Sequence, residues 1–190
     1  MFNHSATASD LMHHWNIWLV TVTLIVAAVI DGMKLKVPNW LTLPMIVSGW
    51  IFNFAVGGWA GLGWSMVGMA VGLALLLPAN IIGGMGEGDV KLLAGVGAWV
   101  LPETTFYAFC WSAVIGGVIA VAMILWRGGW RKHRDQFLMI YSEIMTIGNP
   151  SELSAIAAER KSSMLLLPYG IPIAIGTIAY FAWTGMLGLL

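Results

Sequence analysis

The sequence predicts an all-α polytopic membrane protein with about six transmembrane helices, the fourth of them short. Hydrophobic residues make up 59% of the 190-residue chain and charged residues only 9%, whereas a soluble domain carries about 25% charged residues. The mean hydropathy is +0.83. Apolar residues gather in runs of about 20, the length that crosses a bilayer as a helix. We therefore expect a single membrane-embedded domain over residues 1–190.

Short polar or glycine-rich breaks separate the expected helices. These helices cover residues 11–30, 39–56, 62–82, 90–101, 104–126 and 164–187. The fourth is closed by Pro102 and Glu103, and at ~1.5 Å per residue it crosses only part of a hydrocarbon core of ~30 Å. The first 15 residues contain no Lys or Arg, so we expect no cleaved signal peptide.

The basic residues indicate the orientation. A six-helix count places all nine Lys and Arg residues on one side of the membrane. The positive-inside rule makes that side cytoplasmic and leaves both termini outside. The long polar stretch 127–163 then forms a cytoplasmic loop, either with an amphipathic helix on the inner leaflet or as a solvated helix. Cys110 is the single cysteine; its apolar surroundings predict a packing role, and no disulfide can form within the chain.

Residues 83–91 read GGMGEGDVK and interrupt the apolar sequence. Irregular backbone at membrane depth persists only inside protein or beside a water-filled cavity, and an acid there is a functional-site hypothesis by default. Asp31 ends the first apolar run, and the predicted topology brings it to the same face as Asp89. Two neighbouring carboxyls can share a proton, so that one activates water while the other protonates a peptide carbonyl. The alternative is that each aspartate only marks a helix end.

Two stretches carry a resemblance to a known family. DGMKLKVPNWL from Asp31 and GMGEGDVKLL from Gly84 resemble the two signature regions of the type IV prepilin peptidases, which are polytopic aspartic proteases of the G-x-G-D type. In that family, Pro-Asn follows the first Asp by seven residues, as Pro38 does here. The resemblance extends over most of the chain, from Asp31 to the last helix.

The resemblance implies roles for individual residues. Asp31 and Asp89 would be the catalytic pair, with neither metal nor cofactor. The active-site loop would contain Gly86, Gly88 and Lys91. Positions with a substrate-binding or structural role would be Pro38, Asn39, Pro168, Gly170 and Pro172. The alternative for the segment 168–172 is a simple helix kink. Glu87 occupies a variable position of the motif without an assigned role.

The implied reaction removes the short basic leader of a type IV prepilin or pseudopilin. It would occur at the cytoplasmic face of the bacterial inner membrane, with prepilin and lipids as partners and without nucleic acid. Larger members of the family add paired CxxC motifs and an N-methyltransferase activity. With one cysteine and about eight residues between the first two expected helices, we expect the short, peptidase-only form, similar to those of tight-adherence (Flp) pili.

Two other classes of function remain open from the sequence. One is a non-enzymatic assembly scaffold of a pilus or secretion system that kept the fold. The other is a proton-coupled carrier, although such proteins usually hold their acids near the midplane within repeats. A metalloprotease is not expected, because the chain has no HExxH motif.

Overall fold

The computed structural model describes residues 15–82, 84–127, 139 and 168–188. The helices are α2 (Trp15–Lys34), α3 (Asn39–Ile81), α4 (Glu87–Arg127) and α7 (Gly170–Trp183). No strand occurs within the described ranges, so the all-α prediction is confirmed for this part of the chain. The amphipathic helix expected within 127–163 and the expected first residues of the first helix lie outside the described residues.

Three helices are long and apolar enough to cross a membrane. They are α2, α3 and Glu87–Met123 within α4, whereas α7 is a shorter apolar helix. Large apolar side chains are exposed along these helices, which suits a surface that faces lipid tails. Examples with more than half of the side chain exposed are Val22, Ile25, Val29, Ile51, Val114, Val118 and Leu125. Composition, helix length and exposed surface together describe an integral membrane protein.

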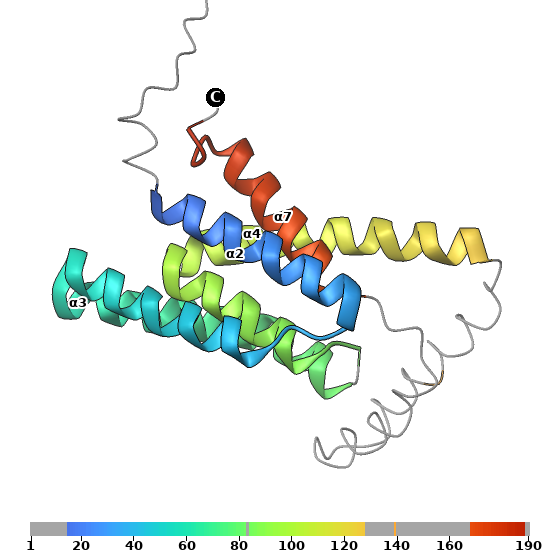
Figure 1. The fold of residues 1–190 in the computed structure, drawn as a ribbon, viewed down its shortest axis with the longest axis horizontal. Helices are drawn as coiled ribbons and strands as arrows, with labels where there is room; N and C mark the ends of the chain where they lie inside the picture. The colour runs from blue at the N-terminus through green and yellow to red at the C-terminus, as the bar shows by residue number, and fades with distance from the viewer. Residues whose placement is uncertain (1–14, 83, 128–138, 140–167, 189–190) are drawn as a thin grey trace, which may run out of the picture.

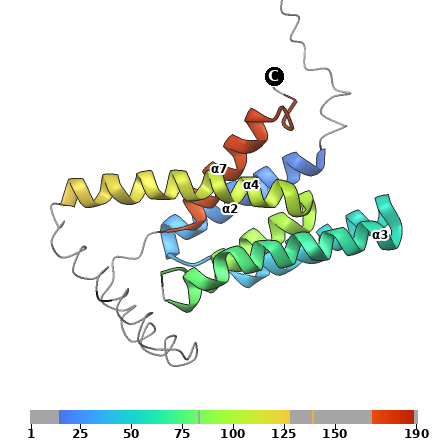
Figure 2. The same ribbon diagram turned by 180° about the vertical axis from the view of Figure 1, so that it is seen from behind.

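A one-residue turn divides α3 into two halves. At Gly58 the backbone leaves helical geometry, with φ 59° and ψ −146°, a conformation that glycine adopts at little cost because it has no Cβ. Figures 1 and 2 show α3 running to one end of the molecule and turning back there. Beyond the turn, Gly61 packs so closely on the Asn53 carbonyl that a Cβ would overlap it. The predicted break between 56 and 62 is therefore a tight helical hairpin.

A second break divides α4 at Leu101, where φ is 67° and ψ is 171°. Leu101 precedes Pro102, and the residue before a proline is disfavoured in the α region. Pro102 also lacks the N–H that would donate to the Ala98 carbonyl one turn earlier. Instead, Asn53 Nδ2 donates to the Ala98 oxygen at 2.9 Å, and the Ser65 hydroxyl donates to the same oxygen. Both halves of α3 therefore hold the first half of α4 at the residue where its own hydrogen bonding stops.

Glycines bring α3 and the first half of α4 into backbone contact. A Cβ added to any of these glycines would come closer than 3 Å to backbone atoms of the facing helix. The glycines are Gly49, Gly68, Gly72 and Gly97. Small residues of this kind let membrane helices approach and gain van der Waals contact. Residues 92–100 are all buried as a result, which explains why this short segment is apolar on every side.

α7 packs against the second half of α4. Gly176 of α7 lies against the Ser112 backbone, and the Ser112 hydroxyl is 3.3 Å from the Ile173 carbonyl oxygen. α2 packs mainly against α7, with Gly32 meeting the Ile171 side chain. α7 therefore joins α2 to the rest of the bundle.

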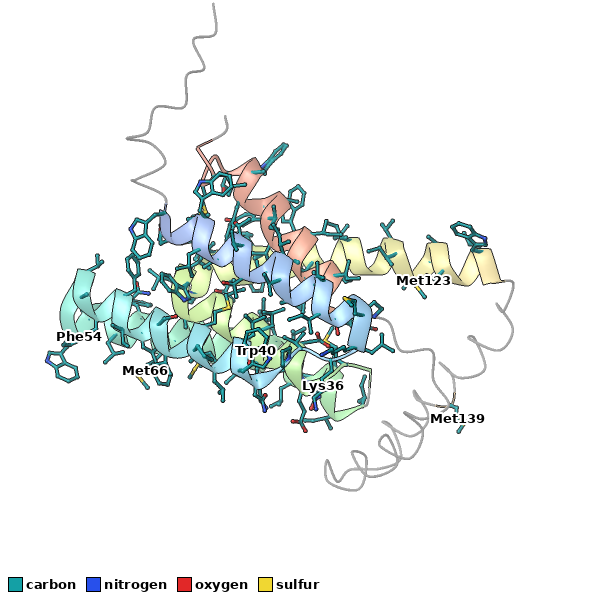
Figure 3. All side chains as sticks on the ribbon, in the orientation of Figure 1. Lys36, Trp40, Phe54, Met66, Met123 and Met139 are labelled. Carbon is teal, nitrogen blue, oxygen red and sulfur yellow. The ribbon has the colours of Figure 1, made fainter. Side chains whose placement is uncertain are left out.

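Lys36 and Lys91 lie at the same end of the bundle. Lys36 and Trp40 lie near the start of α3, whereas Phe54 lies toward the opposite end of its first half (Figure 3). Lys91 is at the same end as Lys36, because its Nζ donates to Asn39 Oδ1 at 3.2 Å. The glycine-rich loop between α3 and α4 closes this same end.

Candidate active site

Asp89 lies in the first turn of α4. This helix begins at Glu87, about one turn before residue 90, the start expected from hydropathy. Because α4 begins at Glu87, Gly86 takes the N-cap position and Asp89 the third helical position. The Gly86 N–H donates to Asp89 Oδ2 at 3.2 Å, as the third residue of a capping box does. The carboxylate thus lies at the positive end of the helix dipole, and Asp89 is only 5% exposed.

Neighbouring backbone holds the glycine-rich loop in place. Gly88 lies against Val37, where an added Cβ would be 2.5 Å from the Val37 carbonyl oxygen. Asn80 Nδ2 donates to the Met85 carbonyl at 3.1 Å. Sequence analysis did not single out Asn80, although an amide near the end of an apolar run is an available signal. These contacts fix the approach of the chain to α4.

Asp31 lies in the last turn of α2 and is 2% exposed. There it faces the negative end of its own helix dipole, which disfavours a carboxylate. The start of α7 compensates, because the Gly170 N–H donates to Asp31 Oδ2 at 2.8 Å. The first N–H groups of a helix have no partner within that helix and attract anions. A side chain at Gly170 would not fit, since its Cβ would lie 2.9 Å from that carboxylate oxygen.

Tyr169 precedes α7 and is half-buried. Burial, together with the negative charge of Asp89, raises the pKa of the Tyr169 phenol. The next residue, Gly170, bonds Asp31 through its backbone N–H. Sequence analysis marked Pro168 and Gly170 in this segment but not Tyr169.

The other positions marked by the sequence lie around the two acids. Pro38 has extended backbone (φ −77°, ψ 146°) and forms the N-cap of α3. Lys91 contacts Asn39 and lies 3.7 Å from Glu87, with much of both charged side chains exposed. Pro172 is buried in the first turn of α7, and no hydrogen bond joins it to either acid.

Both buried carboxylates lie beside the first turn of a helix. Asp89 is in the first turn of α4, and the Asp31 carboxylate lies at the start of α7. Each accepts a hydrogen bond from a backbone N–H. Within the described ranges, no group of three or more His, Cys, Asp or Glu side chains is arranged to hold a metal ion.

Comparison with known proteins identifies the family. Residues 18–121, which include Asp31 and Asp89, match the Type IV leader peptidase family. A prepilin leader peptidase/N-methyltransferase of Aeromonas salmonicida is 34% identical over 116 residues, 57% of this chain and 40% of that protein. Proteins of the same name from Neisseria gonorrhoeae (34% over 121 residues, 58% and 41%) and Klebsiella pneumoniae (35% over 101 residues, 47% and 43%) are also similar.

The chain matches about 40% of the length of these curated relatives. No solved structure matches. The family match covers more than half of the chain and contains both sequence signatures and both buried acids. This protein is a member of the type IV leader peptidase family.

Proposed function

We propose that this protein is an intramembrane aspartic endopeptidase that removes the short basic leader from type IV prepilins or pseudopilins. The observation that carries the proposal is the pair of acids in the matched region, each buried and each bonded to a backbone N–H. Gly170 supplies that N–H to Asp31 and Gly86 supplies it to Asp89. Buried acids are rare in a membrane protein unless they have a function.

In this mechanism the two carboxyls share one proton, because mutual repulsion opposes ionisation of both. The charged carboxylate removes a proton from water while the water oxygen attacks the scissile carbonyl carbon. The protonated partner donates its proton to the carbonyl oxygen. The tetrahedral intermediate then collapses and the C–N bond breaks, as the proton taken from water passes to the leaving amine. One hydroxyl of the intermediate returns a proton to the partner carboxylate, which reforms the carbonyl and restores the shared-proton pair. The two carboxyl groups would titrate as a coupled pair, so a pKa read from the pH–rate profile belongs to the pair and not to Asp31 or Asp89 alone.

The proposal includes a six-span topology in the bacterial inner membrane. α2 and α7 would cross once, and α3 and α4 would each cross twice by turning at Gly58 and Leu101. The site would then face the cytoplasm, since Lys34, Lys36 and Lys91 are at its end of the bundle. The cytoplasmic leader of a prepilin would reach the acids while the apolar helix of the substrate stays in the bilayer.

We propose peptidase activity without N-methyl transfer. The names of the relatives include both activities, but residues 35–38 are all that separates α2 from α3. That connection leaves no room for an inserted domain at this point, and Cys110 is the single cysteine of the chain.

The test is cleavage of a panel of prepilins in membranes that contain the wild type, Asp31→Asn or Asp89→Asn. Asparagine keeps the size and polarity of aspartate but cannot exchange the proton. Glu103→Gln is the matched control, because this exposed acid adjoins the break in α4 and is not part of the site. We expect each aspartate variant to insert normally and to lose leader removal, and the control to cleave as the wild type does.

Two results would contradict the proposal. Normal processing by either asparagine variant would refute the role of the pair. A wild type that leaves every prepilin intact would refute the peptidase assignment and favour an assembly scaffold or a carrier. A mass-spectrometric search for methylated N-termini on the cleaved pilins tests the absence of methyl transfer separately.

A further inference from the structure

α2 and α7 line an apolar groove on the surface of the bundle. The two helices run in opposite directions, so that α7 begins beside the end of α2 (Figure 1). The groove has a volume of about 460 Å³, within the range of roughly 300–1,000 Å³ that is usual for binding clefts. Among the described residues that line it, none has a charged or polar side chain. The groove therefore offers a hollow for an apolar partner.

The hollow results from the sizes of the side chains along the two helices. The exposed lining residues include the large Ile25 and Val29 of α2 and Ile175 of α7. The less exposed ones include Ala28 and Ala174, whose methyl groups leave space between the larger side chains. A row of side chains from a third helix can enter such a space, as ridges enter grooves where helices pack. The shape of the groove thus suits a helix.

One end of the groove adjoins the candidate active site. Gly32 and Ile171 line this end, and a Cβ added to Gly32 would be 3.5 Å from Ile171 Cδ1. Gly32 directly follows Asp31 in the chain. Ile171 directly follows Gly170, whose N–H donates to Asp31 Oδ2 at 2.8 Å. Consecutive Cα atoms are about 3.8 Å apart, so the groove begins one residue away from a hydrogen bond of a candidate catalytic acid.

We propose that this groove binds the apolar membrane helix of the prepilin substrate, over about two turns next to the bond that is cut. The inference rests on the proposed function, which puts the leader at the acids and the substrate helix in the bilayer. The scissile bond then lies where leader and helix meet, and the groove is an apolar surface that begins at this place. From Ile25 to Met33 it extends about 12 Å at ~1.5 Å per residue, less than half of a hydrocarbon core of ~30 Å.

The place of the groove, and not its hydrophobicity, argues for the substrate helix. Lipid tails are as apolar as Leu, so an exposed apolar surface selects no partner by itself in a membrane. Membrane helices associate through close van der Waals packing, which a hollow between two helices provides. A helix that leaves the groove at Gly32 brings its end to Asp31, whereas a lipid tail in the groove would keep that helix away.

The first measurement is photocrosslinking in liposomes between the full-length protein and the prepilins of the panel. A benzophenone amino acid replaces Ile25 or Ile175 in the groove, or Ile51 of α3 as the control, which is exposed but does not line the groove. Asp89→Asn is present in each protein so that the prepilin stays intact. We expect the two groove positions to cross-link to the first turns of the prepilin helix, located by mass spectrometry, and the Ile51 position to cross-link mainly to lipid.

The second measurement is the cleavage kinetics of Ile175→Trp in liposomes. Its matched control is Ile51→Trp, since both isoleucines are about half exposed (47% and 64%). Tryptophan at position 175 fills part of the groove, so we expect KM for the prepilin to rise about fivefold or more. The kcat should change less than about twofold, because the acids are untouched. The control should keep both parameters, and melting temperatures in detergent report whether each variant is folded.

The inference is overturned if the groove positions cross-link to prepilin no more than the Ile51 position does, or only to lipid or to a second copy of this chain. It is also overturned if Ile175→Trp has the KM of its control. The wild type and Asp31→Asn run alongside to separate the two proposals. If only the wild type cleaves and the groove positions do not cross-link to prepilin, this inference alone fails. If the wild type leaves every prepilin intact, the proposed function and this inference fail together.

Discussion

The Ala98 carbonyl offers a quantitative test of how the site is supported. Pro102 deprives this oxygen of its helical donor, and two side chains from the two halves of α3 replace it. The perturbations are Ser65→Ala and Asn53→Leu, separately and together. Leucine has the same branched side-chain skeleton as asparagine, so the second change removes the amide without opening a cavity.

The expected loss of unfolding free energy depends on how many hydrogen-bond donors the Ala98 oxygen keeps. A side-chain hydrogen bond between membrane helices contributes about 0.6 kcal/mol on average. Each single variant should therefore lose about 0.5–1.5 kcal/mol, because the Ala98 oxygen still accepts one hydrogen bond. The double variant leaves this buried carbonyl without either side-chain donor, which costs about 1–3 kcal/mol for the orphaned group alone. Its loss should exceed the sum of the two single losses by about 1 kcal/mol.

The assay is reversible unfolding in mixed micelles by titration with a denaturing detergent, analysed as a double-mutant cycle. Ser48→Ala is the matched control, since the Ser48 hydroxyl donates only to the Met45 carbonyl of its own helix and its loss should cost little. Additive losses, or a double variant no worse than the worse single, would show that Ser65 and Asn53 do not share an otherwise unsatisfied oxygen. The reasoning about Pro102 would then be wrong.

Two further predictions concern the edge of the site. Gly88→Ala places a Cβ 2.5 Å from the Val37 carbonyl oxygen; we expect a loss of about 1–3 kcal/mol in unfolding free energy and a lower cleavage rate. Gly63→Ala, with nothing within 4 Å, should leave both unchanged or raise stability, and equal behaviour of the two variants would contradict the tight contact. Lys91→Gln should change the unfolding free energy by less than about 1 kcal/mol, because its contact with Asn39 is exposed; a larger loss in the same titration would assign Lys91 a structural role.

Local signals in the sequence predicted the helices well. The break expected between 56 and 62 falls at Gly58, and the one expected between 101 and 104 falls at Leu101. Glycine and proline act on the backbone of their own neighbourhood, so their effects are readable without a structure. The number of membrane crossings remains a prediction.

Boundaries near the acids were less accurate for a physical reason. Hydropathy falls at a charge, whereas helical hydrogen bonding does not stop there. α2 therefore continues past Asp31 to Lys34, and α4 begins at Glu87 instead of Val90. An aspartate is favourable in the first turn of a helix, so the start of α4 was in principle readable from the sequence.

Contacts between distant segments could not be predicted in this way. Nothing in the composition of residues 168–172 indicates that Gly170 bonds Asp31, 139 residues earlier in the chain. Tyr169 was missed for the same reason, because the burial that raises the pKa of its phenol exists only once the helices are packed. Sequence reasoning named both acids from their local surroundings, and only the structure shows that the start of α7 bonds Asp31.

The two acids are held in place by different sets of helices. Asp89 is fixed by the start of α4, whose first half is held between the two halves of α3 through glycine contacts. Asp31 is fixed by α2, which depends mainly on α7 for its contacts. A shift of α2 with α7 relative to α3 would therefore change the separation of the acids without unfolding either helix. Gly88 packs against Val37 one residue before Asp89, so a substitution at Gly88 should affect catalysis more than a substitution of equal size elsewhere on these helices.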